Sequence, residues 1–135
     1  MRNRVLLALA LVCVAAAALA EEPTAPSRPL ARLTQPIRVD GELSDPGWVE
    51  ASKIETFYET NVGDNVPPPV KTTAWIGYDS RFFYVAFRCE DPDPKKIRAP
   101  YVDRDNVSSN QDFAGIMLDV KNDRRAALEL FVNPR

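Results

Sequence analysis

The chain has no histidine and only two cysteines, and these shortages exclude several kinds of site. Ser-His-Asp and Cys-His catalytic sites need an imidazole, and so do histidine-ligated haem and zinc. Cys13 lies in an apolar N-terminal run that we expect to be removed, so Cys89 would be the one remaining cysteine and no internal disulfide could form. The position of Cys89 on an apolar strand face favours a small buried side chain over a reactive thiol. Chemistry in this chain would therefore depend on carboxylates, lysine, tyrosine or a hard cation.

Basic residues are also in the minority. Removing Arg2 and Arg4 with a signal peptide leaves 15 of the 17 basic residues against 19 acidic ones, which is a net charge of −4. No basic stripe runs along the chain, and nucleic acid is therefore not expected as a partner.

The N-terminus has the three parts of a secretory signal peptide. A basic start at residues 1–4 precedes an apolar run of 15 residues, and Ala18-Leu19-Ala20 fits a small-residue cleavage site. A retained membrane anchor is the alternative, but the run is shorter than the ~20 residues that a spanning helix needs. A lipoprotein interpretation through Cys13 is discounted, because the bulky Val12 precedes it. We expect cleavage near Ala20 and export to the periplasm, the cell surface or the medium.

The chain is expected to consist of three segments. Residues 1–20 form the signal peptide, and residues 21–35, with three prolines and no periodicity, are predicted to be a flexible leader. Residues 36–135 are predicted to form one domain, for which the length is sufficient but not generous.

The most apolar stretch after the N-terminus is residues 72–91, TTAWIGYDSRFFYVAFRCED. Two runs rich in β-branched and aromatic residues flank a polar turn at residues 79–81, which is typical of a β-hairpin. Side chains alternate along a strand, so one face of this hairpin is predicted to be core and Trp75 lies on the other. The predicted core residues are Ala74, Ile76, Tyr78, Phe83, Val85 and Phe87.

Weaker patterns precede this hairpin. Alternation at residues 37–39 suggests a short strand, and Asp45 before a proline predicts a helix from Pro46 to Ser52. Trp48 on that helix is expected to pack into the core. Residues 55–69 are predicted to be a loop or weak strand.

A long loop and a second hairpin follow. Residues 92–111 contain three prolines and dense charge, and loops of this length are usually functional or mobile. Residues 112–120 and 126–133 alternate apolar and polar side chains around a turn at residues 121–125, which predicts two more strands. Strands joined by polar turns indicate an all-β fold, an antiparallel β-sandwich with one short helix.

Four motifs occur in an order that resembles the family 9 carbohydrate-binding modules. They are IRVDGELSDPGW (residues 37–48), TAWIGYD with FYVAFRCED (73–91), RD with DFAGIMLD (104–119) and LFVNP (130–134). The resemblance is closest to the version at the N-terminus of larger secreted bacterial proteins. It implies a sugar-binding β-sandwich, often attached to a glycoside hydrolase and sometimes holding calcium. It also implies an incomplete sandwich, because the family's domain continues past the last motif.

The sugar site of that family is not matched. Where the family has a stacking aromatic residue, a glutamate and an arginine, this sequence has Ser109, Gly115 and Phe131. The resemblance therefore implies the fold but does not carry over that ligand site.

Four residues are candidates for carbohydrate binding on chemical grounds. Trp75 faces away from the predicted core and could stack on a sugar ring, although packing under another layer is the alternative. Tyr101, Arg104 and Asp112 lie in or beside the long loop and could bond vicinal hydroxyls. Their alternative is a solvated loop with local ion pairs, each worth little.

Calcium and catalysis are weaker hypotheses. Asp119 and Asp123, with Asn122, place oxygen atoms at one turn, but the spacing matches no known calcium loop and turns favour these residues anyway. Glycoside hydrolysis needs a pair of carboxylates, and nothing distinguishes one pair among the 19 acidic residues. Catalysis by this segment is not expected.

The leading hypothesis is a secreted carbohydrate-binding module, the N-terminal part of a larger protein concerned with polysaccharide breakdown. Its expected partners are an oligo- or polysaccharide and the remainder of its own longer chain. The alternative is a structural domain that has lost its sugar site and supports a C-terminal region. A third possibility is a hydrolase acting on O-glycosyl compounds, with its active site beyond residue 135.

Overall fold

The computed structural model describes residues 27–61 and 63–134, so the predicted signal peptide lies outside the described residues. Strands dominate these residues. They are β1 (Ala31–Arg32), β2 (Ser52–Ile54), β3 (Thr72–Tyr78), β4 (Phe83–Cys89), β5 (Ala114–Leu118) and β6 (Leu128–Val132). One helical turn, α1 (Pro46–Glu50), and a 3-10 turn at Pro94–Lys96 complete the elements.

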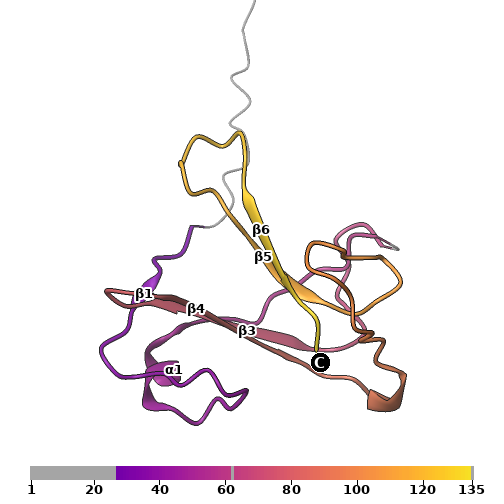
Figure 1. Ribbon diagram of the computed structural model, residues 1–135, viewed down its shortest axis with the longest axis horizontal. Coiled ribbons are helices and arrows are strands. Elements are labelled where there is room, and N and C mark those ends of the chain that lie inside the picture. Colours follow the sequence, from indigo (N-terminus) through magenta and orange to yellow (C-terminus); the bar gives the residue numbers. More distant parts are fainter. Residues whose placement is uncertain (1–26, 62, 135) are drawn as a thin grey trace, which may run out of the picture.

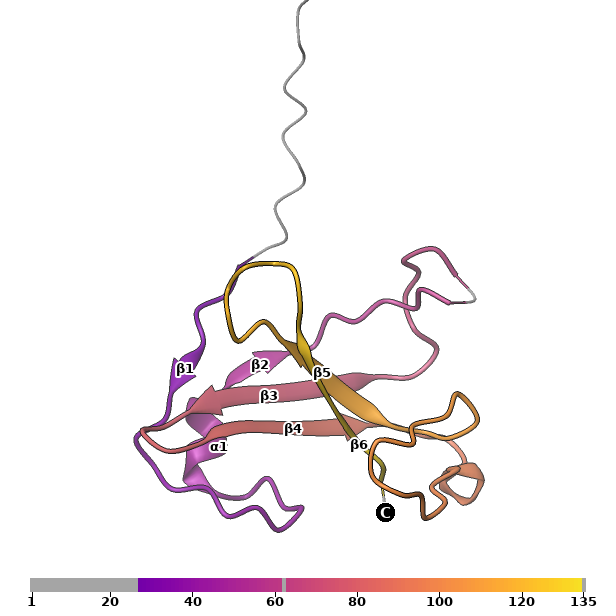
Figure 2. The same cartoon turned by 45° about the horizontal axis from the view of Figure 1, so that its top comes forward.

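Strand β3 organises the larger, four-stranded sheet. Strand β4 pairs antiparallel with one edge of β3 over its whole length, from Thr72↔Cys89 to Tyr78↔Phe83. Strands β1 and β2 pair with different parts of β3, β2 antiparallel opposite residues 74–76 and β1 parallel opposite residues 77–78. Figure 2 shows β1 and β2 along one side of β3 and β4 along the other. Both edges of β3 are therefore paired.

The first hairpin has the predicted strands, but its turn spans residues 79–82 instead of 79–81, and the turn is held by Asp79. The Asp79 carboxylate accepts the backbone N–H of Arg81 at 2.6 Å, that of Phe82 at 2.7 Å and the Tyr84 hydroxyl at 2.9 Å. These bonds, first the one from Arg81, lower the pKa of Asp79 below its ordinary value. The pKa of Tyr84 is raised, chiefly by desolvation and then by its bond to this carboxylate. The turn is therefore tied to the first residues of β4.

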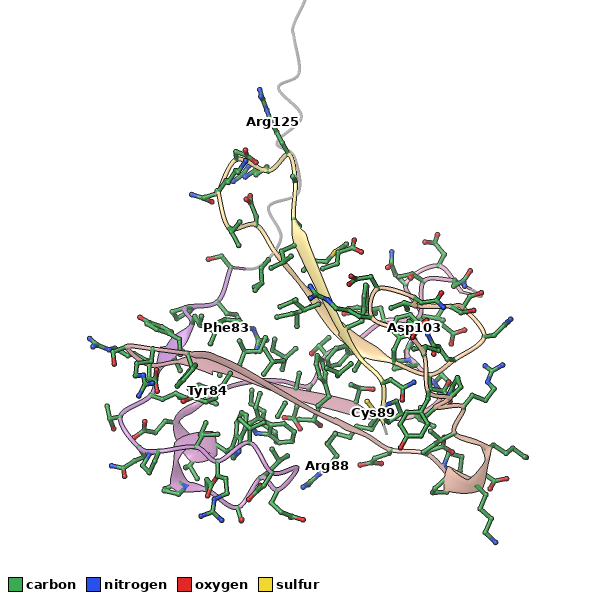
Figure 3. The ribbon with its side chains drawn as sticks, in the orientation of Figure 1. Phe83, Tyr84, Arg88, Cys89, Asp103 and Arg125 are labelled. Carbon is green, nitrogen blue, oxygen red and sulfur yellow. The ribbon has the colours of Figure 1, made fainter. Side chains whose placement is uncertain are left out.

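The two faces of the larger sheet are covered by different elements. The β5–β6 hairpin crosses over one face and α1 lies on the opposite side, as Figure 1 shows. Figure 3 shows Phe83 and Tyr84 on opposite sides of β4, with Tyr84 and Arg88 on the α1 side. The prediction of an all-β, antiparallel-rich sandwich is confirmed, with a helix that ends at Glu50 rather than Ser52.

A compact group of apolar side chains lies on the α1 side. Leu33 and Trp48 are buried, and the Trp48 ring meets Tyr84 edge to face at 6.5 Å between centroids. Gly77 allows the Leu33 side chain to lie close against strand β3, because a Cβ at residue 77 would lie 2.6 Å from Leu33 Cδ2. The expectation that Trp48 packs into the core is confirmed.

The N-terminal boundary of the domain requires correction. Residues 21–35 were expected to form a flexible leader, but β1 and the buried Leu33 fall within that segment. The Leu33 N–H also donates to the Tyr78 carbonyl at 2.7 Å. The Leu33 side chain fills the space over Gly77, so residues 31–33 belong to the folded domain, although the prolines around them predicted a flexible chain.

Other local predictions were also wrong. Residues 37–39 form no strand, because the Asp45 carboxylate accepts the Arg38 N–H at 2.7 Å instead of capping α1. Strand β2 was not predicted. On the apolar face of the first hairpin Ala74 is buried, whereas Tyr78, Phe83 and Cys89, at the two ends of the paired strands, are exposed.

The second hairpin also has the predicted pairing. Ala114, Ile116 and Leu118 are half-buried and stand opposite the apolar residues of β6. The β6 residues expected to point inward (Leu128, Leu130 and Val132) nevertheless keep much of their surface exposed. Among the described residues, no helix is long and apolar enough to cross a membrane.

Leu33→Ala tests whether the former leader belongs to the folded unit. Leu33 is 5% exposed, so its truncation should leave a cavity and lower the free energy of unfolding by about 2–5 kcal/mol. Leu30→Ala, three residues earlier at a position that is 41% exposed, is the matched control and should cost about 0.5 kcal/mol or less. Urea unfolding followed by tryptophan fluorescence measures both, and equal losses would contradict this assignment.

Candidate functional site

A cleft with a volume of about 590 Å³ lies between the long loop and the second hairpin. Residues 102–107 of the loop form one wall, and residues 129–133 of β6 and its end form the other. Gln111 and Phe113, between the loop and β5, complete the lining. We refer to this site as the β6 cleft. Its volume is within the range of about 300–1,000 Å³ that is typical of small-molecule sites.

Hydrogen bonds attach the loop to the hairpin at two points. The Arg98 N–H donates to the Asp112 carboxylate at 2.7 Å, and the Asp112 N–H donates to the Arg98 carbonyl at 2.8 Å. Farther along, Asn133 Nδ2 donates to the Pro100 carbonyl at 3.2 Å. The loop is thus fixed before it enters the cleft wall, so the wall has a defined place.

Two phenylalanines form the apolar part of the cleft. Phe113 and Phe131 meet edge to face, with ring centroids 5.1 Å apart and planes at 77°. Phe131 stands opposite Gly115 in the β5–β6 register, and a Cβ at residue 115 would overlap the Phe131 ring. Gly115 therefore makes room for that ring. The two rings remain 44% and 41% exposed, so a ligand can reach them.

Two amide oxygens near the cleft have no hydrogen-bond partner among the described residues. They are Gln111 Oε1 and Asn133 Oδ1, and each has almost no accessible surface. Leaving a buried acceptor unsatisfied costs about 1–3 kcal/mol. Both residues line the cleft, but these two oxygens are closed off from its open space and are not part of the surface that a ligand would meet.

The charged residues of the cleft are exposed and mostly acidic. Asp103, Asp105 and Glu129 contribute carboxylates, and Arg104 is the one basic residue of the lining. The Arg104 guanidinium lies 3.4 Å from the carboxylate of Asp105. Figure 3 shows Asp103 in the loop beside the β5–β6 hairpin. Asp105 has a positive φ of 65°, a left-handed conformation that aspartate tolerates in turns.

The four carbohydrate-binding residues predicted from the sequence do not form one site. Arg104 lines the β6 cleft. Tyr101 is largely exposed beside it, and Asp112 fastens the loop through the bond to Arg98. Trp75 lies in the larger sheet, half-buried, where Lys53 Nζ and the Arg88 guanidinium carbon approach its ring centroid to 5.9 and 5.8 Å. These cation–π contacts give Trp75 a packing environment.

The two residues proposed as metal ligands lie in the turn of the second hairpin. The Asp119 carboxylate accepts the N–H groups of Arg124 at 2.8 Å, Lys121 at 3.1 Å and Asp123 at 3.4 Å. These bonds, first that from Arg124, lower the pKa of Asp119. The Asp123 carboxylate accepts the Arg125 N–H at 2.9 Å. Within residues 27–61 and 63–134, no three acidic or cysteine side chains gather in a way that could hold a metal ion.

A second cleft, of about 400 Å³, lies between residues 55–58 and 67–72. Its carboxylate, Glu55, is paired with Lys53 at 3.0 Å and Lys71 at 3.2 Å, and these lysines lower its pKa. No lining residue of this cleft has a buried polar atom without a partner. The β6 cleft is larger and contains the edge-to-face pair of exposed rings, and it is therefore the stronger candidate for a binding site.

The long loop at residues 92–111, which the sequence marked as functional or mobile, supplies residues 102–107 and Gln111 of the lining. The lining residues from β6 were not identified as a site, because their approach to the loop depends on contacts made in three dimensions. Gly115 and Phe131 were noted as departures from a sugar site, each taken separately. In the predicted second hairpin Gly115 and Phe131 are direct cross-strand partners. This pairing was the available signal of an aromatic surface, because a glycine opposite an aromatic residue leaves space for the ring.

Comparisons with protein-family models, curated proteins and solved structures found no match for this chain. A function must therefore be proposed from the chemistry of the residues themselves.

The turn at Asp119 gives a direct test of the calcium hypothesis. Because backbone N–H groups already bond the Asp119 carboxylate, we expect the thermal unfolding midpoint to be the same in calcium and in a chelator. Asp119→Ala should lower the midpoint equally in both buffers, and Asp64→Ala, at an exposed position, is the control. A saturable calcium-dependent rise in the midpoint that Asp119→Ala abolishes would show that the turn binds the ion.

Proposed function

We propose that this protein binds carbohydrate in the β6 cleft, as a secreted module of a larger protein concerned with polysaccharide breakdown. The observation that carries the proposal is the combination of two exposed aromatic rings with exposed carboxylate and guanidinium groups in one cleft. Sugars present both matching features, since their C–H faces are apolar and their hydroxyl groups are hydrogen-bond donors.

The aromatic part of the site supports stacking. The rings of Phe113 and Phe131 lie together, and each keeps more than a third of its surface exposed. Aromatic side chains contribute large contact areas at little conformational cost, which suits them to the flat face of a sugar ring. The Phe131 ring packs edge to face against Phe113 and lies close against the backbone at Gly115. These contacts restrict the ring before any ligand binds. A restricted ring loses less entropy on binding.

The polar part of the site supports recognition of hydroxyl groups. The exposed carboxylates of Asp103 and Glu129 can accept hydrogen bonds from ligand hydroxyls, and the Arg104 guanidinium can donate to them. The predicted signal peptide and the resemblance of the sequence to sugar-binding modules agree with this function.

Phe131→Ala tests the proposal. Loss of the ring should weaken binding to the recognised glycan about tenfold or more, starting from a dissociation constant in the micromolar-to-millimolar range. Phe82→Ala removes a ring that is 54% exposed in the first hairpin, outside the cleft, and should change affinity by less than about twofold. Affinity electrophoresis against a polysaccharide panel, followed by calorimetry, measures both variants.

A broad glycan panel without a single response would exclude the proposed function. Equal loss of affinity in Phe131→Ala and Phe82→Ala would place the binding site elsewhere. Urea unfolding of each variant shows whether the fold is retained.

One observation favours a second candidate function, a structural domain that supports the remainder of its own longer chain. Strand β6 is exposed along its whole length and carries four large apolar residues, which is unusual for a free sheet edge. In this case the β6 amides should be protected from hydrogen exchange only in the longer protein, and no glycan should bind. Protection that is the same in both forms would count against docking through β6.

A further inference from the structure

One edge of strand β6 pairs with no other strand among the described residues. Its other edge pairs with β5 in a two-stranded sheet, and no further backbone hydrogen bond reaches residues 128–132 in the part of the chain that the structure describes. All five residues are exposed, and the long loop lies beyond the β6 cleft. A free edge presents a row of backbone N–H and C=O groups, for which the matching partner is another strand.

The free edge lacks the features that usually keep an edge strand from pairing. Natural edge strands carry lysine, proline or a bulge that interrupts pairing. The register between β5 and β6 runs without a bulge over all five residues, and the one charged side chain of β6 is Glu129. The first proline after the strand, Pro134, lies outside it. Strand β6 is therefore open to pairing over its whole length.

The residues of β6 are compatible with a second copy of the same strand. In an antiparallel pair centred on Leu130, that residue faces its own copy and Leu128 faces Val132 of the partner subunit. On the opposite face, Glu129 faces Phe131 of the partner subunit. Centring the pair on Glu129 would instead place two carboxylates opposite each other, which is unfavourable. The centre that uses all five residues therefore also avoids a charge conflict.

We propose that two copies of this protein associate through β6, with the two free edges paired antiparallel about a twofold axis at Leu130. The product is one sheet in the order β5–β6–β6–β5, and three or more strands are usually needed for an independently stable sheet. Five residues bury less surface than a standard interface, so we expect a dissociation constant of about 10 μM to about 1 mM. This association is separate from carbohydrate binding and does not depend on it.

Sedimentation equilibrium of the purified protein, up to about 1 mM, measures this association. A charge placed at residue 130 would meet the same charge across the axis, so Leu130→Lys and Leu130→Glu should each weaken association about tenfold or more. An equimolar mixture of the two variants should restore it, because opposite charges then face each other. Val120→Lys, at a position 72% exposed in the turn of the same hairpin, is the matched control and should associate as the unaltered protein does. Circular dichroism shows whether each variant is folded.

Four results would overturn the inference. The unaltered protein would remain monomeric up to about 1 mM. Val120→Lys would weaken association as much as Leu130→Lys, or the mixture of the two Leu130 variants would stay monomeric, which would place the contact elsewhere. Association would continue into large particles, whereas an isologous pair closes at two copies. A longer form of the protein would be monomeric with its β6 amides protected from hydrogen exchange at every concentration, which would assign this edge to the remainder of its own chain.

Discussion

Strand β3 is paired on both edges and covered on both faces, and the rest of the structure depends on this arrangement. On one face Ala74 is buried beneath the layer that carries the second hairpin. On the other, Gly77 allows Leu33 to approach the backbone closely, next to Trp48 and Tyr84. Because side chains alternate along β3, the strand makes one apolar contact on each face. One contact is with the layer of the second hairpin and the other is with the segment that carries Leu33, and both segments lie far from β3 in the sequence.

The second hairpin is where this scaffold meets the candidate site. Its half-buried face carries Ala114, Ile116 and Leu118, and its other face carries the cleft residues Phe131 and Glu129. The long loop is fastened beside it through the Arg98–Asp112 bonds and through Asn133. The cleft is therefore formed by two segments whose relative position depends on hydrogen bonds at its margins. The resulting surface combines exposed aromatic rings with a surplus of carboxylates.

The sequence predicts those parts of the fold that depend on local patterns. Both hairpins follow from period-2 alternation and polar turns, but the predicted turn at residues 79–81 is one residue shorter than the connection that sets the Tyr78↔Phe83 register. Strand β1 was missed because its pairing with Gly77 and Tyr78 is non-local and its surroundings are rich in proline. In the site, Arg104 was found because long charged loops often carry function. Gln111 was not, since an unsatisfied oxygen is a property of the folded contacts.

Mapping of backbone amide chemical shifts during titration with the tightest-binding oligosaccharide of the glycan panel tests the central claim most directly. Saturable shifts at Asn106, Gln111, Phe131 and Asn133, with the indole signals of Trp48 and Trp75 unchanged, are the result predicted for a ligand in the β6 cleft. Shifts centred on Trp75, or no saturable shifts with any glycan that binds, would contradict the assignment of the site.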